Sequence, residues 1–88
     1  MEEIRIGTVR HFFSRPMIAA VAIEEGTLAL GEALHFLGGT TDLHHRVDSM
    51  QIDHRDVAKA ETGDVVGIRV AARVRERDRV FKVEEAGS

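Results

Sequence analysis

Four arginines occupy every second position near the end of the chain: Arg73, Arg75, Arg77 and Arg79. In an extended segment, alternate side chains project to the same side, and guanidinium groups bind phosphate oxygens through paired hydrogen bonds. The pattern therefore predicts a nucleic-acid-binding surface. With the two nearest basic residues, the surface comprises Arg69, Arg73, Arg75, Arg77, Arg79 and Lys82. Two alternatives stay open: a solvated loop whose charge the two intervening carboxylates partly neutralise, and a loop that meets an acidic patch on a protein partner.

Phe12 and Phe13 are adjacent aromatic residues flanked by His11 and Arg15. Aromatic rings beside basic side chains can stack on nucleotide bases, so Phe12 and Phe13 are candidate stacking residues. The alternative is that one phenylalanine fills the hydrophobic core and the other covers one end of the fold. Of the two interpretations we favour the second.

Histidine and aspartate residues gather in the middle of the chain, which raises the question of a metal site. They are His44, His45 and His54 with Asp42, Asp48 and Asp53. A zinc site needs three or four ligands that converge on one point, and adjacent residues of a strand, such as His44 and His45, point to opposite faces. Neither a His-x-x-x-His nor a His-Glu-x-x-His spacing occurs. We therefore expect no metal and no other cofactor, and we expect His11 and His35 to be partly buried strand residues.

No group of residues has the pattern of an active site. Ser14 and Ser49 lack the context of a nucleophile elbow, and the carboxylate pairs Glu24–Glu25 and Glu84–Glu85 fall in expected turns or in the tail. Catalytic groups need a concave, water-excluding pocket, for which a small filled barrel has little room. The Gly-x-x-x-x-Gly-Lys-Ser/Thr loop that binds nucleoside triphosphates is absent from the sequence. We therefore expect neither an enzyme nor a nucleotide-binding protein.

Short apolar segments separated by turn residues must position these side chains. A turn is expected at Gly26, a bend at Gly31 and a tight turn at Gly38–Gly39, where paired glycines adopt positive φ without steric cost. The apolar pattern predicts strands over 4–13, 17–23, 33–37, 43–52, 65–70 and 80–83, with a short extended piece at 27–30. Residues 17–23 are apolar on both faces, as expected for a strand that is covered on both sides or lies in a closed barrel. A shift in the apolar phase within 43–52 predicts a β-bulge. Residues 56–61 are expected to form a loop or one helical turn, and 73–79 a charged loop.

The six strands, without a helix of substantial length, predict an all-β fold. We expect a small closed antiparallel six-stranded barrel with Greek-key-like connections, because closure leaves no exposed sheet edge. At 88 residues the chain has room for one hydrophobic core. We therefore expect a single domain over residues 1–83 and a frayed tail over 84–88.

Composition limits the environment and the partners of the chain. The net charge of -3 argues against a protein that coats nucleic acid over its whole surface. The absence of Cys excludes a disulfide framework and a thiolate metal site. No apolar run approaches the ~18 residues of a membrane span, and the N-terminus lacks the basic region of a signal peptide, so we expect a cytoplasmic protein. Arginine outnumbers lysine ten to two, which suits a thermophile and equally a GC-rich genome.

Five segments, in this order, resemble the second domain of translational GTPases such as elongation factor Tu. They are Gly7–Val9, Leu28–Leu34, Val47–Gln51, Ala60–Ile68 and Arg73–Val80. Ser49-Met50-Gln51-Ile52 and Arg73-Val74-Arg75-x-x-Asp78 are similar to a variant of that domain, the C-terminal barrel of collagenase-like peptidases. The resemblance extends from about Ile4 to Val83 and implies a translation-protein-type β-barrel.

The same resemblance implies a non-catalytic binding module that contacts RNA, either tRNA or the ribosome, or a ribonucleoprotein. The alternative that it implies is a protein-interaction barrel acting as a detached subunit or accessory domain of a collagenase-like peptidase. A further option is self-association through open strand edges. The sequence includes neither a GTPase domain nor a peptidase domain, so the activities of those domains do not carry over.

Overall fold

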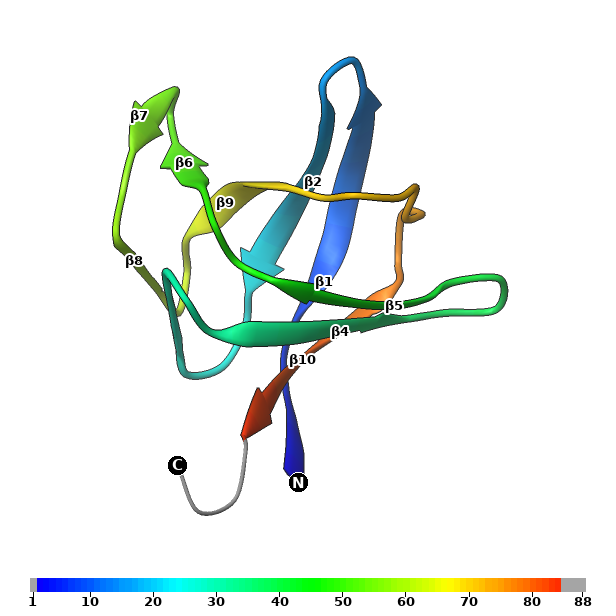
Figure 1. The fold of residues 1–88 in the computed structure, drawn as a ribbon. Helices are drawn as coiled ribbons and strands as arrows, with labels where there is room; N and C mark the ends of the chain where they lie inside the picture. Colours follow the sequence, from blue (N-terminus) through cyan, green and yellow to red (C-terminus); the bar gives the residue numbers. More distant parts are fainter. Residues whose placement is uncertain (1, 85–88) are drawn as a thin grey trace.

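The computed structural model describes residues 2–84. This part of the chain contains ten β-strands, joined by turns and loops, and no helix (Figure 1). The strands are β1 (Glu2–Ser14), β2 (Met17–Ile23), β3 (Thr27–Ala29), β4 (Ala33–Leu37), β5 (Asp42–Arg46), β6 (Met50–Ile52), β7 (Arg55–Asp56), β8 (Lys59–Glu61), β9 (Val65–Arg69) and β10 (Arg79–Glu84). The all-β class expected from the apolar alternation is confirmed for the described residues.

Eight of the strands form one antiparallel sheet in the order β5-β4-β10-β1-β2-β9-β6-β7, and β3 pairs with β8 in a second, two-stranded sheet. The ladder of the larger sheet does not close on itself, because β5 and β7 are its two ends. Asp53 and His54 both have positive φ and fold β7 back onto β6. The short strand β7 thereby takes the edge position that a closing strand would need, and a closed six-stranded barrel is not confirmed.

The long strand β1 is the centre of the larger sheet, pairing with β10 on one side and β2 on the other. Its register shifts between Arg5 and Gly7 against β10 and between Val9 and His11 against β2. Such bulges increase the local twist of a sheet, and in Figure 1 β4 and β5 run across the direction of β1 and β2. The sheet therefore curls around its inner face.

The inner face of the curled sheet carries the hydrophobic core. Its largest fully buried side chains are Phe36, Ile6, Ile23, Leu28, Leu34, Met50, Ile68, Val9, Val21, Val47, Val66 and Val74. β2 was expected to be apolar on both faces, and its inner residues Ala19, Val21 and Ile23 are buried, whereas Ile18 and Ala20 on the other face are partly exposed. One apolar face of β2 is thus only partly covered.

Two details of the chain differ from the sequence-based expectations. Residues 43–52 do not form one bulged strand but two strands, β5 and β6, which the irregular segment 47–49 separates. Residues 56–61 contain the end of β7 and the strand β8 instead of a helical turn. β8 forms because its backbone pairs with β3, which lies far away in the sequence.

The glycine turns occur where they were expected, although one of them has a different physical cause. Gly26 and Gly31 have positive φ, as a turn and a bend require. Gly38 and Gly39 connect β4 to β5, but neither is among the glycines with positive φ. Gly38 is required for space, because a Cβ atom there would lie 1.9 Å from Oδ1 of Asp78.

The expected frayed tail, residues 84–88, lies outside the described residues except for Glu84, which ends β10. Within residues 2–84 there is no helix with the length and apolarity that a membrane span requires.

Candidate functional site

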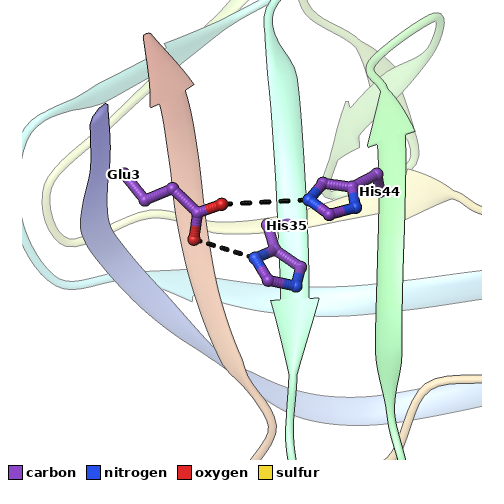
Figure 2. Close-up of side chains that lie close together, drawn as sticks. All are labelled: Glu3, His35 and His44. Carbon is purple, nitrogen blue, oxygen red and sulfur yellow. Dashed lines mark hydrogen bonds and ion pairs between the residues drawn. The ribbon is translucent and has the colours of Figure 1, made fainter. Parts of the chain in front are cut away.

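A cluster of polar side chains lies on the outer face of the sheet, across β1, β4 and β5 (Figure 2). The register places His35 of β4 directly opposite His44 of β5, and their imidazole rings stack with centroids 4.0 Å apart and planes 16° apart. Glu3 of β1 reaches both rings. One carboxylate oxygen lies 2.8 Å from Nδ1 of His35 and the other lies 3.8 Å from Nε2 of His44.

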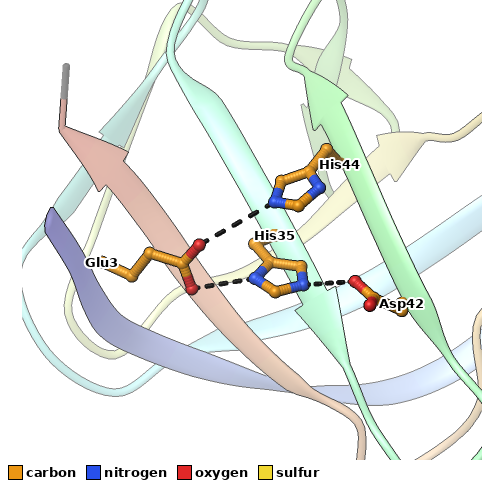
Figure 3. Close-up of polar contacts among 4 residues, drawn as sticks. All are labelled: Glu3, His35, Asp42 and His44. Carbon is orange, nitrogen blue, oxygen red and sulfur yellow. Dashed lines mark hydrogen bonds and ion pairs between the residues drawn. The ribbon is translucent and has the colours of Figure 1, made fainter. Parts of the chain in front are cut away.

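Asp42 completes this cluster from the first position of β5 (Figure 3). Its Oδ1 lies 2.6 Å from Nε2 of His35, so each ring nitrogen of His35 faces a carboxylate. His35 itself is buried, with 9% of its surface exposed, and the ring of Phe81 lies 6.1 Å away. We call Glu3, His35, Asp42 and His44 the histidine cluster.

The charges in the histidine cluster shift the protonation of His35. Burial by itself lowers the pKa of His35, but hydrogen bonds to Glu3 and Asp42 and the negative charges of the two carboxylates outweigh burial. The pKa of His35 is therefore raised above its ordinary value of 6.5. Chemically, the cluster can hold an extra proton between carboxylates or offer nitrogen and oxygen ligands to a cation.

The sequence pattern alone did not predict this cluster, although part of it follows from the hairpin between β4 and β5. Folding the chain about the Gly38–Gly39 turn pairs His35 with His44, so a hairpin register drawn from the turn would have brought the two histidines together. The contact of Glu3 with His35 could not be predicted from this hairpin, because it depends on β10 lying between β1 and β4. His35 is a strand residue, as expected, and it is more fully buried than expected.

The other histidines lie apart from the cluster. His45 points to the opposite face of β5 from His44, as expected for adjacent strand residues, and its Nε2 is buried with no hydrogen-bond partner among residues 2–84. His54 lies in the β6–β7 turn. His11 is exposed and its Nδ1 lies 2.9 Å from Glu76, so the expectation that His11 is partly buried is wrong.

The arginines of the predicted nucleic-acid-binding surface are exposed, but they do not follow one extended strand. A turn interrupts the segment at Glu76–Arg77, where Arg77 has positive φ. The carboxylate of Asp78 is buried and accepts a hydrogen bond from the backbone N–H of Arg75 at 2.7 Å. The arginines at 73 and 75 precede this turn and Arg79 begins β10, so the alternation in sequence is not an alternation along one strand.

Of the six basic residues, five have guanidinium groups that form no ion pair within residues 2–84: Arg69, Arg73, Arg75, Arg77 and Arg79. The sixth, Lys82, is largely engaged by the fold. Its ammonium donates to the carbonyl oxygen of Thr27 at 2.8 Å and lies 3.3 Å from the carboxylate of Glu32. Lys82 thus links β10 to residues of β3 and of the β3–β4 turn. Because its ammonium already has these two partners, it is poorly placed to bind a phosphate.

The two adjacent phenylalanines occupy different environments. Phe12 is partly buried and packs against the core, with the guanidinium of Arg73 5.9 Å from its ring centre. Phe13 is 51% exposed and lines an open, mostly apolar groove with Pro16, Ile18 and Val65. Asp53 and His54 of the β6–β7 turn also line the groove. The groove lies over the partly covered face of β2, and we call it the Phe13 groove.

Two curated proteins are similar in sequence to nearly the whole of this chain. No family model matches the chain. An uncharacterized protease of Methanocaldococcus jannaschii is 36% identical over 84 residues, and a collagenase of Porphyromonas gingivalis is 28% identical over 85 residues. These alignments include 94% and 96% of this chain. The chain spans 20% of the length of each of these relatives.

Solved structures match most of the chain. The C-terminal domain of a putative U32 peptidase from Geobacillus thermoleovorans superposes with a TM-score of 0.83 over 93% of each chain, at 15% sequence identity. This chain has the same fold as that domain. GDP-bound aIF5B from Aeropyrum pernix also matches, with a TM-score of 0.65 at 23% identity, over 91% of this chain and 15% of the factor. A fold shared by a peptidase-associated domain and a translation factor agrees with the resemblance found in the sequence, whereas the specific likeness to elongation factor Tu stays a prediction.

Proposed function

We propose that this chain is a non-catalytic accessory domain of a U32-type, collagenase-like peptidase and acts by binding protein. The main support for the proposal is the share of this chain, and of each relative, that the alignments include. Nearly the whole chain aligns with a fifth of an uncharacterized protease and of a collagenase, and its fold matches 93% of the C-terminal domain of a putative U32 peptidase. This coverage supports the interpretation that the matched unit is an accessory domain and that proteolysis belongs to the remaining four fifths of those proteins.

The geometry of the histidine cluster supports a non-catalytic role. Catalytic acids and bases work in concave sites that exclude water. The side chains of Asp42 and His44 are 71% and 64% exposed, so these two groups of the cluster are solvated on the outer face of the sheet. Proteolysis by the larger protein would then depend on residues outside this chain.

The Phe13 groove is the surface that best suits a protein partner. Phe13 and Val65 each expose about half of their surface, at 51% and 49%, and both line the same groove. Exposed apolar surface that is contiguous, and not scattered, is typical of interaction sites. We assign this groove to the contact with the peptidase-type catalytic region.

Affinity capture from the lysate of the source cells tests the proposal. The bait is the tagged 88-residue chain, wild type or Phe13→Ser/Val65→Ser, with and without nuclease treatment. We expect a stoichiometric protein that mass spectrometry identifies as a U32-type peptidase, that survives nuclease and that the double variant loses. Leu30→Ser is the matched control, because Leu30 is 45% exposed and lies outside the groove. Recovery of RNA alone, or of a partner that the double variant retains, would contradict the proposal.

A second candidate function, contact with RNA, rests on the five exposed arginines, which form no ion pair within residues 2–84, and on the fold shared with aIF5B. Phosphate contacts release counterions, so the affinity for RNA should fall steeply with salt concentration. Arg73→Glu with Arg75→Glu should weaken binding of tRNA measured by fluorescence anisotropy. Arg10→Glu with Arg55→Glu, which changes exposed arginines elsewhere, is the control. Salt-independent binding, or equal effects of the two double variants, would exclude this function.

A further inference from the structure

We propose that Glu3, His35 and His44 bind a divalent transition-metal ion of the zinc class, and that Asp42 orients His35 for this purpose. The inference is independent of the proposed function, because it rests on the geometry of the histidine cluster and its test requires no partner protein. Three separate strands supply the ligands, and Figure 2 shows all three side chains pointing toward one another.

The distances between the ligand atoms suit a metal ion. One carboxylate oxygen and one nitrogen from each ring all lie within 4.8 Å of one another. In a tetrahedral zinc site with bonds of about 2.0–2.1 Å, neighbouring ligand atoms lie about 3.3 Å apart. One carboxylate oxygen of Glu3 lies 2.8 Å from Nδ1 of His35 and the other lies 3.8 Å from Nε2 of His44, so both rings have a Glu3 oxygen at a distance near that value. The three groups are thus close enough to share one ion once their side chains reorient.

His35 is already held in the orientation that a metal ligand needs. In metal sites the nitrogen of a histidine that does not bind the ion usually donates to a carboxylate, which sets the tautomer and the ring plane. Asp42 stands in this position, 2.6 Å from Nε2 of His35 (Figure 3). With the Nε2 proton donated to Asp42, the lone pair of Nδ1 is directed toward Glu3 and the position of the ion.

A proton competes with the metal at the same nitrogen. When His35 is doubly protonated, its Nδ1–H donates to Glu3 at 2.8 Å. A divalent ion that binds Nδ1 replaces this proton, which is released to solvent, while the Nε2–H bond to Asp42 is kept. The ion also offsets the two negative charges of Glu3 and Asp42. Metal binding should therefore release one proton for each His35 that was doubly protonated.

His44 must turn its ring to complete the site. A bound ion lies in the plane of each ligating imidazole, and two rings only 16° from parallel and 4.0 Å apart share no such point. The side chain of His44 is 64% exposed, so its rotation disturbs little packing. Two imidazoles with one carboxylate favour zinc, cobalt, nickel or copper over magnesium and calcium. The remaining coordination positions are open to water.

Titration of the chelator-treated chain with Zn²⁺ in a calorimeter is the direct experiment, and Co²⁺ absorption in the visible range reports the coordination geometry. We expect one ion per chain and proton release that is visible when buffers of different ionisation enthalpy are compared. Asp42→Asn should weaken binding about 10–100-fold, the usual effect of losing the carboxylate behind a histidine ligand. Glu3→Gln and His44→Gln, which remove ligands, should weaken it at least as much.

His11→Gln is the matched control, because His11 is an exposed histidine paired with a carboxylate outside the cluster. This variant should bind Zn²⁺ as the wild type does. The exposed position of His44 keeps the test valid if Glu3→Gln fails to fold, and thermal unfolding in chelator checks each variant. The proposal is wrong if the wild type shows no saturable binding, if His44→Gln keeps full affinity, or if His11→Gln loses as much affinity as His44→Gln.

Discussion

Asp42 reaches diagonally from the start of β5 to His35 on β4, and its Oδ1 lies 2.6 Å from Nε2 of His35 (Figure 3). This contact and the contact of Nδ1 with Glu3 give one buried imidazole two carboxylate partners. A neutral imidazole has one N–H and can donate to only one of them. The protonated ring satisfies both, so the fold favours the charged form of His35.

The first prediction is that His35 makes the stability of the chain depend on pH. The pKa of His35 in the folded chain is raised above 6.5, so its contribution to stability is complete below the unfolded pKa and is lost as the pH rises through the folded pKa. Urea unfolding in the presence of chelator, from about pH 6 to about pH 9, should show a greater loss of stability for the wild type than for His35→Gln. Parallel pH profiles for the two proteins would contradict the assignment.

The second prediction concerns the contribution of Asp42 to this pKa. Asp42→Asn removes a negative charge and a hydrogen-bond acceptor next to His35, while burial, which lowers the pKa, stays. The pKa of His35, followed by NMR of its ring protons in metal-free buffer, should therefore fall relative to the wild type. Asp48→Asn, at an exposed position outside the histidine cluster, should leave it unchanged. An unchanged His35 pKa in Asp42→Asn would mean that Glu3 alone raises it.

The third prediction compares two neighbouring glycines. A Cβ atom at Gly38 would lie 1.9 Å from the buried carboxylate of Asp78, whereas a Cβ atom at Gly39 would meet nothing within 4 Å. Gly38→Ala should displace Asp78 from the N–H of Arg75 and lower the free energy of unfolding by about 1–3 kcal/mol. Gly39→Ala should change it by no more than about 0.5 kcal/mol. Chemical denaturation of both variants makes the comparison, and equal stabilities would show that the loop of residues 73–78 adapts freely.

The fourth prediction separates the roles of the two phenylalanines. Phe12 packs against the core, so Phe12→Ala should lower the free energy of unfolding by about 1–3 kcal/mol. Phe13 is half exposed in its groove, and Phe13→Ala should stay within about 0.5 kcal/mol of the wild type. Thermal and urea unfolding measure both effects. A larger loss for Phe13→Ala would mean that the Phe13 groove is a structural element and not a free surface.

Several features of this protein could be predicted from the sequence because they depend on neighbouring residues. The turn at Gly26 and the bend at Gly31 require positive φ, which glycine adopts at little cost. The apolar runs at residues 17–23 and 33–37 have the same bounds as β2 and β4. The opposite directions of His44 and His45 follow from the pleat of any strand. The resemblance to the C-terminal barrel of collagenase-like peptidases and to a translation-factor domain could also be recognised from the sequence, because it depends on the order of such short segments.

The tertiary structure decided the features that join distant segments. Glu3 and His35 are 32 positions apart and meet only because β10, from the end of the chain, pairs with both β1 and β4. A glycine is needed at position 38 because the carboxylate of Asp78 occupies the space of a Cβ atom. The alternation of the arginines is interrupted by a turn in which Asp78 accepts a hydrogen bond from the N–H of Arg75. The residues 59–61 become a strand through pairing with β3. Pairings of this kind depend on which strands become neighbours in the folded sheet, and local propensity carries no information about that choice.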